Sequence, residues 1–229
     1  MKTFFLRAIK WLVSLLGILA ISLIFMVKGM ANPQQSPLVA LAEQGDLHQL
    51  QSLVEQGADI EQRDLRQRTP LMAATHKNQI AVARYLIEQG ANVNARDAMQ
   101  DSPYLYAGAR GLQEILLLTL QNGADLTSTN RYGGTALIPA AERGHVQTVK
   151  TLIDAGVDVN HVNRLGWTAL IEAIILGDGS DKYAQIVTLL INGGADVNLA
   201  DSTGASPLTL AKSKGYRNLI EILEKSGAK

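Results

Sequence analysis

The chain has 229 residues, and its 21 basic and 21 acidic side chains give a formal net charge of +0. It contains no cysteine, which excludes a disulfide framework, a cysteine-based zinc site and a lipidated cysteine anchor. Four of the basic residues precede Ala31 and no acidic residue does, so the rest of the chain carries a net charge of −4. That sign argues against broad nucleic-acid binding.

Residues 1–31 have the three-part pattern of an export signal. Three basic residues open the chain, and Trp11–Val27 follows as a run of seventeen residues without a charge. Small residues before a polar tail then predict a signal peptide that is cleaved after Ala31, with a linker over residues 32–36. Two alternatives remain open. Seventeen apolar residues are at the lower limit for an uncleaved membrane anchor, and a buried core helix has the same composition.

The signal and the anchor predict the same location for the rest of the chain. The flank before the apolar run holds three basic residues and the flank after it holds one. Because the more basic flank stays inside, the remainder faces outward. For a bacterial exported protein, we therefore expect either a periplasmic location or attachment to the inner membrane on its periplasmic side.

Two sequence markers then repeat with one period. The first is a glycine followed by Ala or Val, with its copies at Gly57, Gly90, Gly123, Gly156, Gly194 and Gly227. The second is a hydroxyl residue followed by Pro or Ala, with its copies at Thr69, Ser102, Thr135, Thr168 and Ser206. Both advance by 33 residues, except for one shared step of 38. A fixed period of this length indicates stacked supersecondary units that bury their apolar faces against one another.

Each unit is predicted to be a helix, a turn, a second helix and a loop. In the first copy, Thr69 is an N-cap residue and Pro70 suits the first helical position. The apolar residues of Ile80–Ile87 then repeat with helical spacing, and Gly90 stands where a left-handed residue ends a helix. The segment Asn92–Asp97 leads into the next cap and indicates a projecting, hairpin-like loop.

These residues closely resemble the ankyrin repeat, whose pattern is Thr-Pro-Leu-His-x-Ala-Ala, a glycine, Leu-Leu and Gly-Ala-Asp-Val-Asn. The resemblance covers residues 37–229 and implies an all-α solenoid of stacked helix-turn-helix units. We expect an N-terminal capping half-unit over residues 37–62 and five repeats over residues 63–229. The family histidine is absent from every copy, so the loops must be braced differently. Tyr104 replaces a core leucine and Pro139 lies within a first helix, and we expect the second repeat to pack less regularly.

Residues typical of catalysis or metal binding are sparse. The histidines His48, His76, His145 and His161 have no metal-ligand spacing, and no nucleophile elbow, phosphate loop or dinucleotide fingerprint occurs. His145 is expected to be structural. The five extra residues over 178–182 lack the distal glutamate of a calcium loop, so we interpret them as a solvated turn at the edge away from the loop tips. We therefore expect no enzyme activity, no cofactor and no metal.

The resemblance implies that a partner docks on the loop tips and the exposed side of the first helices. The residues at those positions are rich in the arginine and aromatic types that dominate interface hot spots. The alternative is that these arginines are solvated and that Trp167 lies flat on a neighbouring loop. The predicted partner-binding residues are Arg66, Arg68, Met99, Arg110, Arg131, Tyr132, Arg143, Arg164, Leu165, Trp167, Ile175 and Leu176.

The function predicted from these observations is a non-catalytic protein–protein interaction scaffold in the bacterial periplasm. Its partner is expected to be a protein with an acidic surface patch, not a nucleic acid, and the chain is expected to be a monomer. The inner membrane is a partner only if residues 1–31 remain attached. Two other functions fit the same features: an immunity-type inhibitor of a toxic periplasmic enzyme, and an accessory factor for a periplasmic enzyme.

Overall fold

The computed structural model describes residues 36–229, and the predicted signal or anchor over residues 1–31 lies outside this range. Within it, twelve helices form six consecutive pairs. The pairs are α2 (Pro37–Gln44) with α3 (Leu47–Glu55), α4 (Pro70–His76) with α5 (Ile80–Glu88), α6 (Pro103–Arg110) with α7 (Gln113–Gln121), α8 (Leu137–Glu142) with α9 (Val146–Asp154), α10 (Ala169–Ile175) with α11 (Asp181–Asn192), and α12 (Pro207–Lys214) with α13 (Arg217–Lys225).

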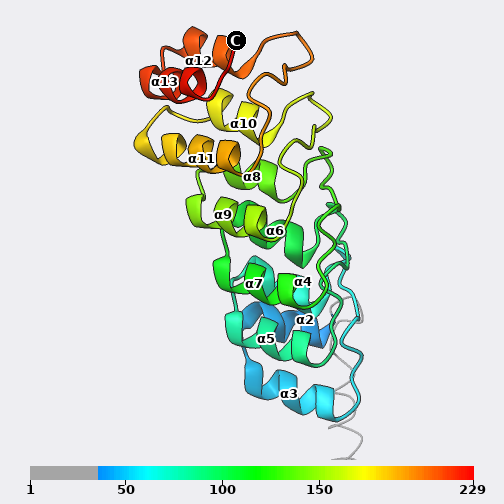
Figure 1. Ribbon diagram of the computed structural model, residues 1–229. Helices are drawn as coiled ribbons and strands as arrows, with labels where there is room; N and C mark the ends of the chain where they lie inside the picture. The colour runs from blue at the N-terminus through cyan, green and yellow to red at the C-terminus, as the bar shows by residue number, and fades with distance from the viewer. Residues whose placement is uncertain (1–35) are drawn as a thin grey trace, which may run out of the picture.

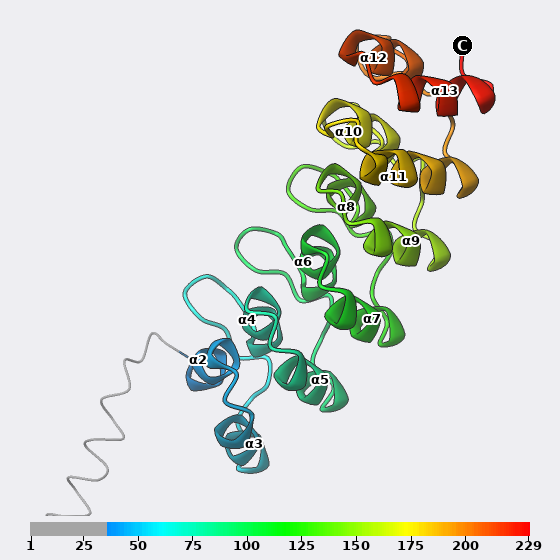
Figure 2. The same cartoon turned by 90° about the vertical axis from the view of Figure 1, so that its left-hand side faces the viewer.

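The pairs stack in chain order from α2–α3 at one end to α12–α13 at the other (Figure 1). The first helices of successive pairs contact one another and form one layer, while the second helices form the other layer (Figure 2). The loops between pairs project from the side of the first helices. No strand occurs within residues 36–229. The predicted all-α solenoid is therefore confirmed. The N-terminal unit differs from the prediction, because it contains a complete helix pair, α2 and α3.

A single apolar core runs through the stack between the two helix layers. Its buried members come from every pair, including Leu38, Leu71, Leu137 and Leu219, each with an exposed fraction of 0%. Each helix pair is too thin to bury these side chains alone, so the neighbouring pair covers them. None of the helices in the described part of the chain is long and apolar enough to cross a membrane.

Hydroxyl caps fix where most of the first helices begin. The side chains of Thr69, Ser102, Thr168 and Ser206 each accept a hydrogen bond from the backbone N–H three residues later, as N-cap residues do. The helix α8 is the exception. It begins one residue later than its counterparts and has only six residues, and the buried hydroxyl of Thr135 has no partner.

The irregular unit is therefore the third repeat. The prediction that the second repeat packs less regularly is wrong. Pro139 lies within α8 and has no N–H to donate to the carbonyl of Thr135, whereas Ala73 N–H donates to Thr69 at 3.0 Å in the first repeat. Tyr104 fits into the core with an exposed fraction of 0%, and α6 keeps all eight of its residues. The buried hydroxyl of Tyr104 has no hydrogen-bond partner, and burial raises the pKa of Tyr104.

Asparagine and aspartate side chains brace the projecting loops in place of the family histidine. Asp97, Asn130, Asn163 and Asp201 each accept two backbone N–H bonds, from the residues two and four positions later. Such contacts fold a loop tip locally. Because the same residue types recur in each loop, successive tips take similar conformations along the stack.

The insertion over residues 178–182 is exposed to solvent at Asp178, Ser180, Asp181 and Lys182, as expected, but it also packs on another repeat. Asp181 and Lys182 belong to the first turn of α11, which has twelve residues where α9 has nine. The remaining turn packs on the last repeat, where the Tyr216 hydroxyl donates to the Gly177 carbonyl at 2.9 Å and the Asn218 amide donates to the Gly179 carbonyl at 2.7 Å. The insertion therefore lengthens the fourth repeat and ties it to the fifth.

Candidate functional site

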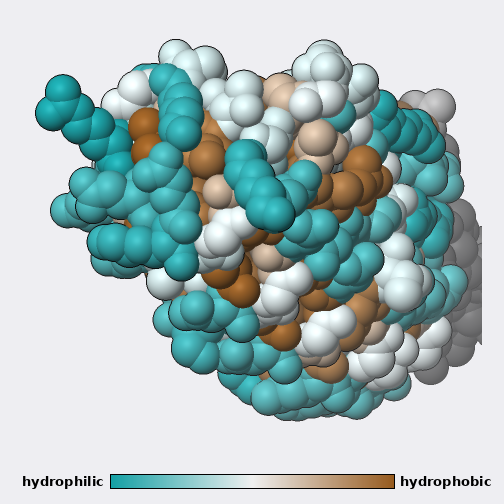
Figure 3. All heavy atoms as spheres, turned by 45° about the horizontal axis from the view of Figure 1, so that its top comes forward, coloured by the Kyte–Doolittle hydropathy of each residue, from teal (hydrophilic) through white to brown (hydrophobic). Residues whose placement is uncertain are grey.

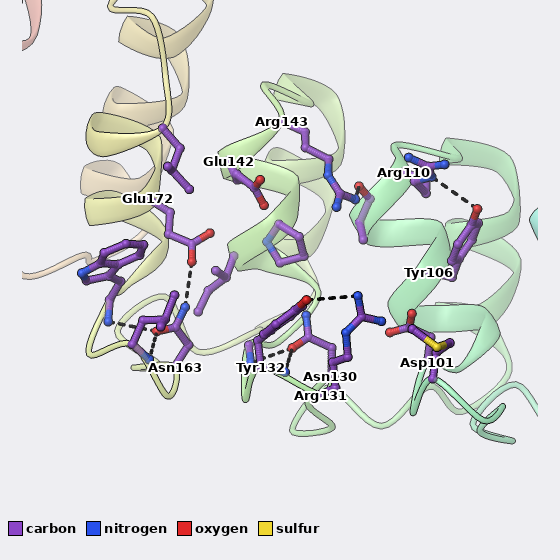
Figure 4. Close-up of a pocket in the computed structure, with 18 of the residues that line it drawn as sticks. Asp101, Tyr106, Arg110, Asn130, Arg131, Tyr132, Glu142, Arg143, Asn163 and Glu172 are labelled. Atoms are coloured by element: carbon purple, nitrogen blue, oxygen red, sulfur yellow. Dashed lines mark hydrogen bonds between the residues drawn. The ribbon is translucent and has the colours of Figure 1, made fainter.

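A groove of about 580 Å³ crosses the first-helix layer and loops of the second to fourth repeats. Its walls come from α6, α8 and α10 and from the loops that precede them, with one contribution from the end of α4. Figure 4 shows side chains from these elements converging on the groove. Eight of the predicted partner-binding residues line it, namely Met99, Arg110, Arg131, Tyr132, Arg143, Leu165, Trp167 and Leu176.

The other four predicted residues lie elsewhere. Arg66 and Arg164 are exposed outside the groove lining, and Ile175 is half-buried. The prediction for Arg68 is wrong, because its side chain is buried with an exposed fraction of 6%. Its guanidinium forms ion pairs with Asp64 at 2.8 Å and with Glu43 at 3.1 Å. Arg68 therefore joins the first repeat to the N-terminal unit and does not face a partner.

Four of the seven large apolar side chains that are exposed within residues 36–229 line this groove, whereas Leu65, Leu117 and Val162 lie outside it. Met99, Tyr132, Leu165 and Leu176 all line it, and each is about half exposed, from 48% to 55%. In the view of Figure 3, which brings the C-terminal end of the stack forward and shows another face, hydrophobic residues also lie singly or in small groups between hydrophilic ones. Single exposed apolar residues are normal, but several in one concave region bordered by charges are typical of an interface.

Two arginine–tyrosine pairs shape the end of the groove formed by the second and third repeats. The Arg131 guanidinium lies 4.7 Å from the centre of the Tyr132 ring and donates to its hydroxyl at 3.1 Å. Arg110 lies over the Tyr106 ring at 5.5 Å and donates to the hydroxyl at 3.3 Å. These contacts hold both arginines against aromatic faces, which reduces the entropy that each would lose on binding a carboxylate.

Acidic groups also line this end of the groove, namely Asp97 and Asp101. Burial raises the pKa of Asp101, and the nearby Asp97 raises it further, while Arg131 and Arg143 oppose the shift. The ring of His76 stacks on Tyr106 with 4.2 Å between centroids, and burial lowers its pKa. The groove is therefore of mixed charge.

Glu172 is the main groove residue that the sequence interpretation missed. Its exposed fraction is 5%, and one carboxylate oxygen accepts a hydrogen bond from the Asn163 amide at 2.7 Å. Burial raises its pKa to about 7, and the negative charge of Glu142 adds to the shift. Glu172 occupies the free position x of the Thr-Pro-Leu-His-x-Ala-Ala pattern, and Tyr106 and Pro139 occupy it in the preceding repeats. Because this position varies between repeats, it was the one sequence feature that could have indicated Glu172 as a groove residue.

Trp167 lines the groove and is half-buried, so it does not stand free in solvent. Its backbone N–H donates to the Asn163 side chain at 3.1 Å, and the neighbouring Leu165 N–H donates to the same oxygen at 2.9 Å. Asn163 thus positions the loop that carries Trp167 and also the carboxylate of Glu172. Within residues 36–229, no group of three His, Asp or Glu side chains is arranged to hold a metal ion.

The fold and groove define a class of protein: a helical-repeat solenoid that presents a concave surface to a partner. The ankyrin repeat model (three copies) matches residues 8–97 and 104–182, and the single ankyrin repeat model matches residues 165–202. The chain belongs to the ankyrin repeat family. Ankyrin repeats are protein-interaction scaffolds and are generally not catalytic.

Solved ankyrin structures are similar over most of the chain. An ankyrin repeat domain from Acinetobacter baumannii AYE is 58% identical, covers 84% of this chain and 98% of its own, and superposes with a TM-score of 0.83. The ankyrin repeat protein EF0377 is 41% identical, covers 82% of this chain and 96% of its own, and has a TM-score of 0.79. The ankyrin repeat domain of Bcl-3, a member of the IkappaB family, is 29% identical, covers 85% and 87%, and has a TM-score of 0.77.

A curated relative matches a shorter segment. The ankyrin repeat protein YahD of Escherichia coli (strain K12) is 42% identical over 57 residues, which are 25% of this chain and 28% of the relative. The match therefore spans less than a third of either protein. It supports the repeat family and carries no information about a particular partner.

Proposed function

We propose that this protein is a non-catalytic scaffold that binds a protein partner in the groove of its second to fourth repeats. The observation that carries the proposal is the gathering of four half-exposed apolar side chains, Met99, Tyr132, Leu165 and Leu176, in one groove bordered by arginines. Burying them against a partner would remove apolar surface from water, which is the main favourable term in most protein associations.

The arginine end of the groove supports a partner with an acidic patch. Arg110 and Arg131 are held against tyrosine rings, and Arg143 donates to the Ala109 carbonyl at 2.6 Å. All three retain N–H groups that these contacts do not use, since a guanidinium has five donors. Carboxylates of the partner would accept them as charge-assisted hydrogen bonds.

The proposed compartment is the bacterial periplasm, and the pattern of residues 1–31 supports it. An alkaline phosphatase fusion after residue 36 is expected to be active, because that enzyme folds only after export. Intact mass of the purified protein then distinguishes cleavage after Ala31 from an uncleaved anchor. An inactive fusion would contradict the proposed compartment without affecting the groove. We also propose that the chain acts as a monomer, which sedimentation of the purified protein tests.

The binding proposal is tested by pull-down from a periplasmic extract with variants of the groove. Trp167→Ala combined with Arg131→Glu is expected to lose partners that the wild type recovers. The matched control is Arg84→Glu, which makes the same charge change at an exposed position of α5. If the groove variant recovers every partner unchanged, the groove is not the binding site. A recovered toxic enzyme whose activity the chain blocks would define its role as an inhibitor.

A further inference from the structure

The two ends of the groove carry opposite charges. Arg110 and Arg131 lie at the end formed by the second repeat and the loop after it, while Glu142 and Glu172 lie on the neighbouring helices α8 and α10 (Figure 4). Arg143 follows Glu142 directly, but its guanidinium donates to Ala109 in α6 and so is directed toward the second repeat. The groove therefore has a net positive part, where three arginines outnumber Asp97 and Asp101, and a negative, acidic part at Glu142 and Glu172.

The acidic part lacks an internal counter-ion. Among residues 36–229, no lysine or arginine forms an ion pair with Glu142 or Glu172. Glu172 is 5% exposed, and within residues 36–229 its carboxylate accepts one hydrogen bond, from the neutral Asn163 amide. Burial and the negative charge of Glu142 disfavour its ionised form more than Asn163 and the positive charge of Arg143 favour it, which raises its pKa to about 7. A positive charge that a bound partner places beside Glu172 would favour the ionised carboxylate and offset the cost of burying it.

The surroundings of the two carboxyl groups also suit the stem of a basic side chain. Trp167, Leu165 and Leu176 line the same groove from the same repeat as Glu172. Lysine and arginine bury their methylene stems along apolar surface while the charged end stays with polar partners. An indole face adds a favourable cation–π contact when a cation lies over it.

We infer that the acidic part of the groove, between Glu142, Glu172 and Trp167, is a pocket for a lysine or arginine side chain of the bound partner. This inference rests on the groove being the partner-binding site proposed above. It deepens that proposal by giving the partner a charge order. A basic side chain binds at the fourth repeat, and an acidic group binds at Arg110 and Arg131 of the second and third. A partner docked in the reverse direction would meet like charges at both ends, so the order also fixes orientation.

The test is a selection from random twelve-residue displayed peptides on the full chain, repeated on the double variant Glu142→Gln and Glu172→Gln. Glutamine keeps the size of the side chain and one accepting oxygen, and removes its charge. Peptides selected on the wild type are expected to be enriched in Lys or Arg. Replacing that residue by norleucine, or using the double variant, is expected to weaken their binding about tenfold or more, since hydrogen bonds to charged groups contribute about 1.5–3 kcal/mol.

The outcomes separate the two proposals. Peptides that lose binding to Tyr132→Ala bind in the groove. If such peptides have no excess of Lys or Arg, or bind the double variant equally well, the basic-residue pocket is wrong while the groove remains the binding site. If no selected peptide depends on Tyr132, both the pocket and the proposed binding groove are contradicted. The matched control for the double variant is Glu88→Gln with Glu114→Gln, two exposed positions on the second helices α5 and α7.

Discussion

Replacing Glu172 by glutamine is expected to stabilise the free protein, and to do so only at neutral and alkaline pH. Glu172 is 5% exposed and its pKa rises from 4.5 to about 7, chiefly because it is buried and then because Glu142 is negative. The folded state therefore binds this proton more tightly than the unfolded state does. Its contribution to stability is complete below about pH 4.5 and is lost as the pH rises through about 7.

The size of the effect follows from the shift. Each pKa unit corresponds to about 1.36 kcal/mol, so a shift from 4.5 to about 7 sets an upper limit of about 3 kcal/mol. The groove is open to water, which screens part of this, so we expect about 2 kcal/mol. Glutamine is neutral at every pH and can still accept the Asn163 hydrogen bond. Its advantage over the wild type should therefore grow by about 2 kcal/mol between roughly pH 5 and pH 8.5.

Urea unfolding followed by far-ultraviolet circular dichroism at the two pH values measures this difference. The control is Glu114→Gln, on the exposed face of α7. The difference in unfolding free energy between this variant and the wild type is expected to be the same at both pH values. Equal unfolding curves for wild type and Glu172→Gln at both pH values would refute the reasoning. The carboxyl would then have to be solvated or paired with a cation in the folded protein.

Three further substitutions test the packing. Gly108→Ala should cost about 1–2 kcal/mol, because its new Cβ would lie 2.8 Å from the Cβ of Ala136 where α6 meets α8. Arg68→Met should cost about 3 kcal/mol by leaving Asp64 without a cation and Glu43 with Lys77 alone, whereas the exposed Arg66→Met should change stability by less than about 0.5 kcal/mol. Gln100→Gly should add about 0.5–1 kcal/mol, because φ is 65° there. Urea midpoints measure all three, and the opposite sign in any one contradicts its contact.

The repeat pattern was enough to predict the fold because its signals are local. A hydroxyl cap, a proline at the first helical position and a left-handed glycine each act within one turn of helix. The helix beginning at Pro70 after Thr69, and the left-handed Gly90 after α5, lie where the sequence placed them. The short α8 departs from this because Pro139 removes one backbone donor inside the helix.

The features that the sequence did not reveal depend on contacts between units. Arg68 has the same position in its loop as Trp167, yet it is buried because Glu43 of the preceding unit lies within 3.1 Å. Glu172 is polar and stands at a variable position, so exposure was the natural expectation for it. Its burial follows from Asn163 and from α8 beside it. The role of the 178–182 insertion likewise depends on Tyr216, 39 residues from Gly177 in sequence.

Site-specific photocrosslinking in cells measures most directly whether this groove binds a partner. A photoreactive residue would replace Tyr132 or Leu165 in the groove and, as controls, Arg84 or Glu114 on the exposed side of the second helices. The groove positions are expected to give a discrete crosslinked product and the control positions none. Products from the control positions alone, or none from Tyr132 and Leu165, would contradict binding in the groove of the second to fourth repeats.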